Sequence, residues 1–226
     1  NEMSLESQVE NGTPDETVKV AKACCGKKNQ LVTLRDRFGP LFRNSDFRDI
    51  YSWKGSRGIA PEILASVTVL QHVEKLSDSQ AATMVQTRID WKYLLGVALD
   101  YAGFDSSVLS EFRDRLLANE ASERLFELPL QHMKELGLVK ERGRQRTDST
   151  HVLASIRTLN RLELVAETLR YSLNQLAVVA PHWLTEWLPD EWLERYASRM
   201  EEAKFPHEES QRQRLMQTIA EDGLHL

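Results

Sequence analysis

Residues 60–96, with the sequence APEILASVTVLQHVEKLSDSQAATMVQTRIDWKYLLG, predict that this chain folds as helices. Pro61 and Glu62 are typical of a first helical turn, where proline costs no needed donor and a carboxylate meets the positive end of the helix dipole. A stripe of apolar side chains at helical spacing follows: Ile63, Leu64, Val67, Leu70 and Val73. This segment therefore predicts an amphipathic helix that packs one face into a core.

The second half of this stretch predicts two shorter helices. Ser77 opens the first, because SDSQ matches a capping box with Gln80 three positions on. After Thr87 a further short helix ends at Gly96, a residue that favours helix ends. The pair has the length and spacing of a helix-turn-helix motif. Two interpretations stay open: the pair docks in a DNA groove, or it is core scaffold.

The flanking sequence extends this helical region. SSVLSEF predicts a helix that ends near Asn119, and another spans residues 122–136 before Gly137. We expect a compact helical N-terminal domain over residues 31–139. Residues 1–30 are polar and lack sustained periodicity, which predicts a disordered or loosely ordered tail.

The composition of the chain changes at residues 140–153, KERGRQRTDSTHVL, which begin with several cations. Threonines and Val152 around Asp148 favour a short strand over residues 146–153. A carboxylate leaving a strand can bind Mg²⁺, and the cations before it would neutralise DNA phosphates. Asp148 is therefore the candidate catalytic and metal-binding residue; the alternative is a turn or a helix N-cap. His151 either contacts substrate or metal or faces solvent or the core. The candidate DNA-binding cations here are Arg142, Arg144 and Arg146.

A second concentration of positive charge lies nearer the N-terminus. We call it the N-terminal basic cluster: Arg35, Arg37, Arg43, Arg48, Lys54 and Arg57. The aromatic residues Phe42, Phe47, Tyr51 and Trp53 are interleaved with it. Basic side chains among aromatics suit phosphate contact together with base or sugar packing. Arg113 and Arg115 are expected to add charge on the polar side of a later helix. The alternative is a solvated face in which these cations pair with Asp36, Asp46, Asp49 and Asp114.

The C-terminal part, residues 140–226, predicts mainly helix after the strand. Residues 157–179 form a long amphipathic pattern that Pro181 ends. Trp183, Trp187 and Trp192 follow closely, which indicates a core or an interface between elements more than a ligand platform. We expect an exposed apolar face on the residue 157–179 helix, with marginal stability or self-association in this part.

The overall composition limits the classes of protein to which this chain could belong. The net charge of −5 argues against a nucleic-acid partner, but the basic residues are clumped, so local patches decide. No run approaches the apolar length of a membrane helix, so no membrane partner is expected. The adjacent Cys24 and Cys25 are typical of reduced thiols in a cytosolic protein.

Three runs resemble bacterial insertion-sequence transposases of the DDE type. They are residues 42–96, FDSSVLSEFRDRL at 104–116, and RTDSTHVLASIRTLNRLELVAETLR at 146–170; the resemblance covers about residues 31–205. It implies an N-terminal helical domain followed by the first strand and helices of an RNase-H-like α/β domain. It also implies that Asp148 is the first acid of a catalytic Asp-Asp-Glu triad that binds Mg²⁺. Double-stranded DNA at transposon ends would be the partner, held in part by Arg43, Lys54 and Arg57. The protein would act in the bacterial cytoplasm, associated with the nucleoid.

The chain departs from that family after Asp148. Neither Asp190 nor Asp222 follows an apolar strand-like run, so neither is assigned as the second acid, and no glutamate is assigned. We therefore expect the N-terminal portion of a transposase, truncated within its RNase-H-like domain and inactive in strand transfer on its own. The alternatives are a catalytically inactive helical DNA-binding module or regulatory remnant, and a helical interaction protein that does not bind nucleic acid.

Overall fold

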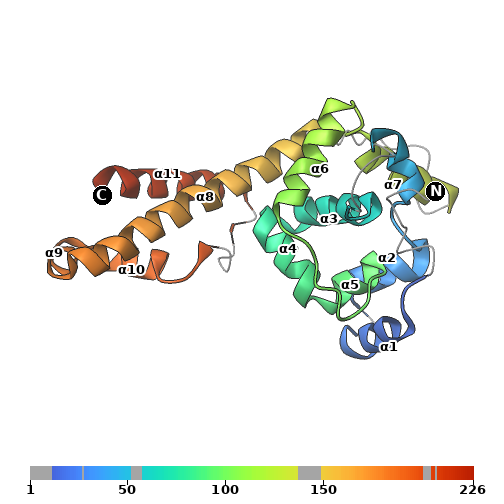
Figure 1. Ribbon diagram of the computed structural model, residues 1–226, viewed down its shortest axis with the longest axis horizontal. Coiled ribbons are helices and arrows are strands. Elements are labelled where there is room, and N and C mark those ends of the chain that lie inside the picture. The colour runs from blue at the N-terminus through green and yellow to red at the C-terminus, as the bar shows by residue number, and fades with distance from the viewer. Residues whose placement is uncertain (1–11, 27, 52–57, 137–148, 201–204, 207) are drawn as a thin grey trace.

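The computed structural model describes residues 12–26, 28–51, 58–136, 149–200, 205–206 and 208–226, and only the backbone of residues 149–152. Figure 1 shows an N-terminal helical body from which the long helix α8 (Ser149–Val179) extends toward a smaller C-terminal group of helices. The described residues contain helices and no strand, so the mainly α prediction is confirmed.

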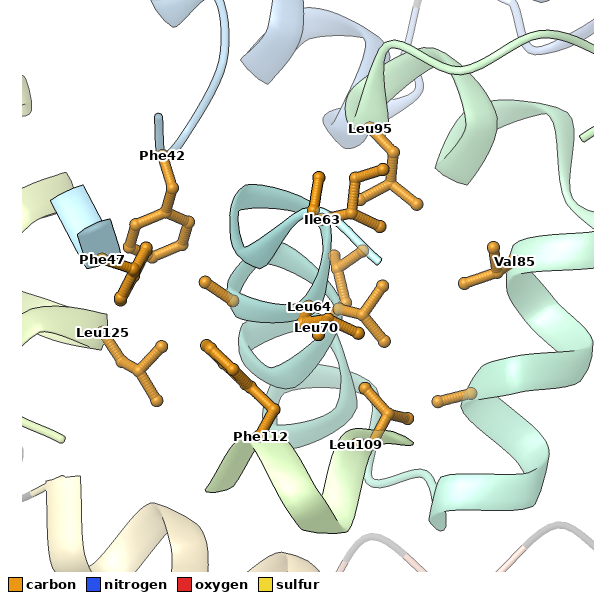
Figure 2. Packing of buried hydrophobic residues seen from close by; sticks show 14 of the residues in the cluster. Phe42, Phe47, Ile63, Leu64, Leu70, Val85, Leu95, Leu109, Phe112 and Leu125 are labelled. Carbon is orange, nitrogen blue, oxygen red and sulfur yellow. The ribbon is translucent and has the colours of Figure 1, made fainter. Parts of the chain in front are cut away.

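The N-terminal body surrounds one helix, α3 (Pro61–Glu74). Figure 2 shows α3 in the middle of the core, with Phe42, Phe47 and Leu125 on one side and Val85 on the other. The 3-10 helix η1 (Asn44–Ile50), α4 (Asp78–Thr87) and α6 (Ser107–Ala118) contact α3. Helices α1 (Asp15–Cys24) and α2 (Gln30–Phe38) pack on α5 (Ile89–Leu95), and α7 (Arg124–Glu135) adds Leu125 to the core. Burial extends around most of α3, beyond the predicted stripe; Val73, which was assigned to that stripe, is exposed.

Local chemistry sets the helix ends where the sequence predicted them. Pro61 is the first residue of α3, and the Ser77 hydroxyl accepts a hydrogen bond from the Gln80 backbone N–H at 3.2 Å. The Gln80 side chain in turn accepts a second hydrogen bond from the Ser77 backbone N–H at 3.0 Å, which completes the capping box. Gly96 ends α5 in the left-handed conformation, with φ of 72°.

Helix α8 joins two hydrophobic clusters. Leu153 belongs to the N-terminal cluster, whereas Leu159, Leu162 and residues further along belong to a second cluster. The second cluster also takes in α9 (Pro181–Trp187), α10 (Asp190–Tyr196) and α11 (Glu209–His225), and α10 and α11 lie along α8 in Figure 1. The start of α8 therefore packs on the N-terminal body, and the rest of the helix belongs to the second cluster.

Two expectations differ from the structure. The short strand predicted over residues 146–153 is wrong for residues 149–153, which are the first turns of α8. Leu153, Ile156 and Leu159 are buried at helical spacing, and this packing outweighs the β-tolerant threonines. Part of the predicted tail is also ordered: α1 buries Thr17 and Ala21, and Val18, Ala21 and Cys25 pack with Tyr93 of α5. Residues 1–11 and 27 lie outside the described part.

Every helix in the described part of the chain is too short or too polar to span a membrane.

Candidate nucleic-acid interface

Three arginines of the N-terminal basic cluster are exposed to solvent. Arg37 lies in the last turn of α2, Arg43 immediately precedes η1, and Arg48 lies within η1. Within the described part of the chain, none of the three side chains forms an ion pair. These guanidinium groups are therefore available to an anionic partner.

The neighbouring carboxylates are engaged elsewhere, which keeps the arginines free. Asp36 accepts a hydrogen bond from the Tyr93 hydroxyl at 2.5 Å, and Asp46 accepts one from the Arg43 backbone N–H at 2.7 Å. Asp49 forms a bidentate pair with Arg124 of α7, at 2.6 Å for each bond. Hydrogen bonding from Arg124 holds the pKa of Asp49 below its ordinary value. The structure thus disfavours the interpretation in which these acids neutralise the basic cluster.

Arg124 is a residue that sequence reasoning missed. Its Nη1 also donates to the Asp46 carbonyl at 2.9 Å, so one guanidinium fixes η1 against α7. Asp49 and Arg124 are 75 residues apart in the sequence, and no local sequence pattern indicates such a contact.

Two arginines that were predicted to add surface charge are structural instead. Arg35 is only 9% exposed; its guanidinium donates to the Leu94 carbonyl at 3.1 Å and to the Thr13 hydroxyl at 3.0 Å. Burial lowers the pKa of Arg35. Arg113 is buried against Asp78, so its assignment to the polar side of α6 is wrong. Both arginines stabilise contacts between helices and cannot reach a nucleic acid.

The interleaved aromatic residues belong to the core. Phe42 and Phe47 are buried, with ring centroids 5.7 Å apart, and Phe47 packs edge-on against Phe112 at 5.8 Å. Tyr51 lies under the Arg115 guanidinium, 4.3 Å from ring centroid to Cζ. The expectation that Phe42 and Phe47 stack on bases is therefore wrong: both rings anchor this segment in the core, whereas Arg43 and Arg48, each next to one of them in the sequence, are exposed.

The possible helix-turn-helix pair is core scaffold. In α5 every residue from Asp90 to Leu95 is buried, so this helix has no free face for a DNA groove. Arg88, between the helices, hydrogen-bonds Glu74 and Asp90, the latter at 2.7 and 3.0 Å. Burial disfavours the charged form of Asp90, but hydrogen bonds from Arg88 and Asn29 outweigh it and lower the pKa. Of the two helices in this pair, only α4 presents exposed polar side chains, at Thr83, Gln86 and Thr87.

A cavity of about 200 Å³ lies beside Arg43, between the start of η1 and α7. It is lined by both signs of charge, with Arg43 and His132 facing Asp46 and Glu135. An anion in this cavity would meet two carboxylates, so the exposed outer surface of Arg43 is the better phosphate contact.

Most other predicted site residues fall outside the described part. They are Lys54, Arg57, Arg142, Arg144, Arg146 and Asp148; for His151 only the backbone is described. Among the described residues, no group of three or more His, Cys, Asp or Glu side chains could hold a metal ion. No metal site and no catalytic step are therefore built from the described residues alone.

Neither the curated proteins nor the solved structures include a match to this chain. Residues 22–115 match the family model described as "Transposase domain (DUF772)". The matched range includes α2, η1, α3, α4 and α5, and with them the three exposed arginines. The match supports a transposase family for this chain.

Proposed function

We propose that this chain acts in transposition, binding transposon-end DNA through Arg37, Arg43 and Arg48. The observation that carries the proposal is a set of three exposed guanidinium groups, without an ion-pair partner among the described residues, inside the segment that matches a transposase domain. Guanidinium groups recognise phosphate oxygens by forked hydrogen bonds.

The proposed contact is with the DNA backbone. With Phe42 and Phe47 buried, the described part of this surface offers cations and no stacking platform. Such binding positions a protein on duplex DNA and depends strongly on salt. Lys54 and Arg57 would extend the same surface, and Arg142, Arg144 and Arg146 would contact the DNA near Asp148.

Phosphodiester chemistry at Asp148 is the second part of the proposal. By the family resemblance, Asp148 would be the first carboxylate of a metal site in an RNase-H-like domain, and Mg²⁺ bound there would supply the means to cut and join phosphodiesters. One carboxylate cannot hold two metal ions. Further acidic ligands would therefore be needed beside Asp148, and this part of the proposal assigns none.

The test compares two double variants that remove the same charge. Arg43→Ala/Arg48→Ala removes the proposed contacts, whereas Arg199→Ala/Arg214→Ala removes two exposed arginines of the C-terminal part. Binding to a labelled duplex is measured by fluorescence anisotropy over a salt series. Log K falls as log salt rises, and each lost phosphate contact should make this slope about 1 less steep. The slope of the first variant should therefore be about 2 less steep than that of the unaltered protein.

The control variant should retain the slope of the unaltered protein. Equal losses in the two variants would mean that net charge alone governs binding. No binding by the unaltered protein at low salt would refute the proposal.

A further inference from the structure

Helix α8 carries an apolar face that the described part of the chain does not cover. Its opposite face packs on α9, α10 and α11 through the second hydrophobic cluster. We define the α8 stripe as Leu164, Val165, Tyr171, Val178 and Val179, whose exposed fractions run from 52% to 79%. Leu164, Tyr171 and Val178 are seven residues apart, about two helical turns, so they lie on one side of the helix.

The five side chains of the stripe carry no charge, and the partly exposed Glu167 on its flank is paired with Arg170. Thr168 and Gln175, which share this side by their spacing, are exposed and neutral. The stripe spans about 22 Å at the rise of an α-helix. An exposed apolar surface of this kind marks an interaction site, and the absence of cations on it disfavours a nucleic acid.

Charge at the two ends of the stripe distinguishes the possible orientations of a partner helix. The exposed Arg161 precedes it, together with Arg157, whose guanidinium pairs with Asp114. The exposed Glu186 and Asp190 follow it in α9 and α10. Two copies packed in parallel would bring like charges together at both ends. Antiparallel packing instead brings the basic end of each copy to the acidic end of the other.

We propose that the α8 stripe is a dimer interface at which two copies of this chain pack α8 against α8 in antiparallel orientation. The two-fold axis passes beside Tyr171, the midpoint of the stripe, so Leu164 of one copy faces Val178 of the other. An isologous contact of this kind closes on itself and gives a dimer. Dimerisation by α8 is independent of DNA binding by the N-terminal basic cluster, so the two experiments fail separately.

The test uses a charge pair placed across the proposed axis. Leu164→Glu alone and Val178→Arg alone each bury an unpaired charge, so each should weaken the dimer by at least about tenfold in sedimentation velocity over a concentration series. The double variant Leu164→Glu/Val178→Arg should recover most of the affinity, because antiparallel packing sets each Glu against an Arg. Parallel packing would set like charges together and leave the double variant the weakest.

Val73→Glu is the matched control, since Val73 is an exposed apolar residue of α3 outside the stripe. It should leave dimerisation unchanged, and circular dichroism should show equal helix content in all variants. A monomer at every concentration, an equal loss with Val73→Glu, or failure of the double variant to recover would each overturn the proposal.

Discussion

Arg113 and Asp78 form a bidentate ion pair at the centre of a hydrogen-bond network that connects four helices, α3, α4, α6 and α8. Arg113 Nη1 and Nη2 lie 2.7 and 2.6 Å from the two carboxylate oxygens, and the arginine side chain is only 3% exposed. Asp78 also accepts from Gln71 of α3 at 2.7 Å and from Asn160 of α8 at 2.8 Å. The same network thus joins α4 and α6 and fixes the start of α8 on the N-terminal body.

Replacing Arg113 should strongly destabilise the fold. Arg113→Ala leaves the largely buried Asp78 carboxylate without its cation, which typically costs about 3–5 kcal/mol. Chemical denaturation followed by circular dichroism measures the loss in the free energy of unfolding. Arg157→Ala is the matched control, because Arg157 pairs with Asp114 at an exposed site; its cost should stay within about 1 kcal/mol. Equal costs for the two variants would contradict the assignment of Arg113 to the core.

Gly96 should tolerate substitution poorly, for two separable reasons. Its φ of 72° disfavours any side chain, and an added Cβ would lie 2.9 Å from Nη2 of Arg35. Because that guanidinium is fixed by Leu94 and Thr13, Gly96→Ala should cost more than the left-handed conformation alone. Gly26→Ala isolates the conformational cost of about 1 kcal/mol, since Gly26 has φ of 68° and open space around it. A thermal denaturation series that gave the same loss at both glycines would show that Arg35 moves aside freely.

The helix ends could be predicted because their determinants are local. Pro61, the Ser77–Gln80 capping box and Gly96 act within one turn of their own helix, and each lies where the sequence placed it. The strand around Asp148 was predicted from equally local β-tolerance. Its described residues are helical instead, because Leu153 and Ile156 find buried positions on the N-terminal body.

The candidate interface could be predicted only in part, because burial depends on distant partners. Arg35 is separated by 59 residues from Leu94, and Arg113 by 35 from Asp78. Neither contact leaves a local sequence signal, so these two arginines looked like surface charges. The sequence predicted that Arg43 is exposed. It did not predict that Asp49 pairs with Arg124 of α7 instead of with an arginine of the N-terminal basic cluster.

Tyr93 should make stability fall at alkaline pH. Burial first, and then its hydrogen bond to Asp36, raise the pKa of the Tyr93 hydroxyl to about 12, against about 10 in an unfolded chain. Below pH 10 the hydroxyl is protonated in both states, so its contribution is fully present. Between about pH 10 and 12 the unfolded chain releases the proton while the folded chain keeps it, so stability declines as pH rises.

The measurement is urea unfolding at a series of pH values for the unaltered protein, Tyr93→Phe and Asp36→Asn. Tyr93→Phe should cost about 1 kcal/mol near pH 8, where it loses the hydrogen bond to Asp36. That difference should shrink as pH rises through the window, because only the unaltered protein loses the contribution of a protonated Tyr93. Asp36→Asn should narrow the window without abolishing it, since burial of Tyr93 remains. A difference between the unaltered protein and Tyr93→Phe that stays constant from pH 8 to 12 would show that Tyr93 does not keep its proton in the folded state.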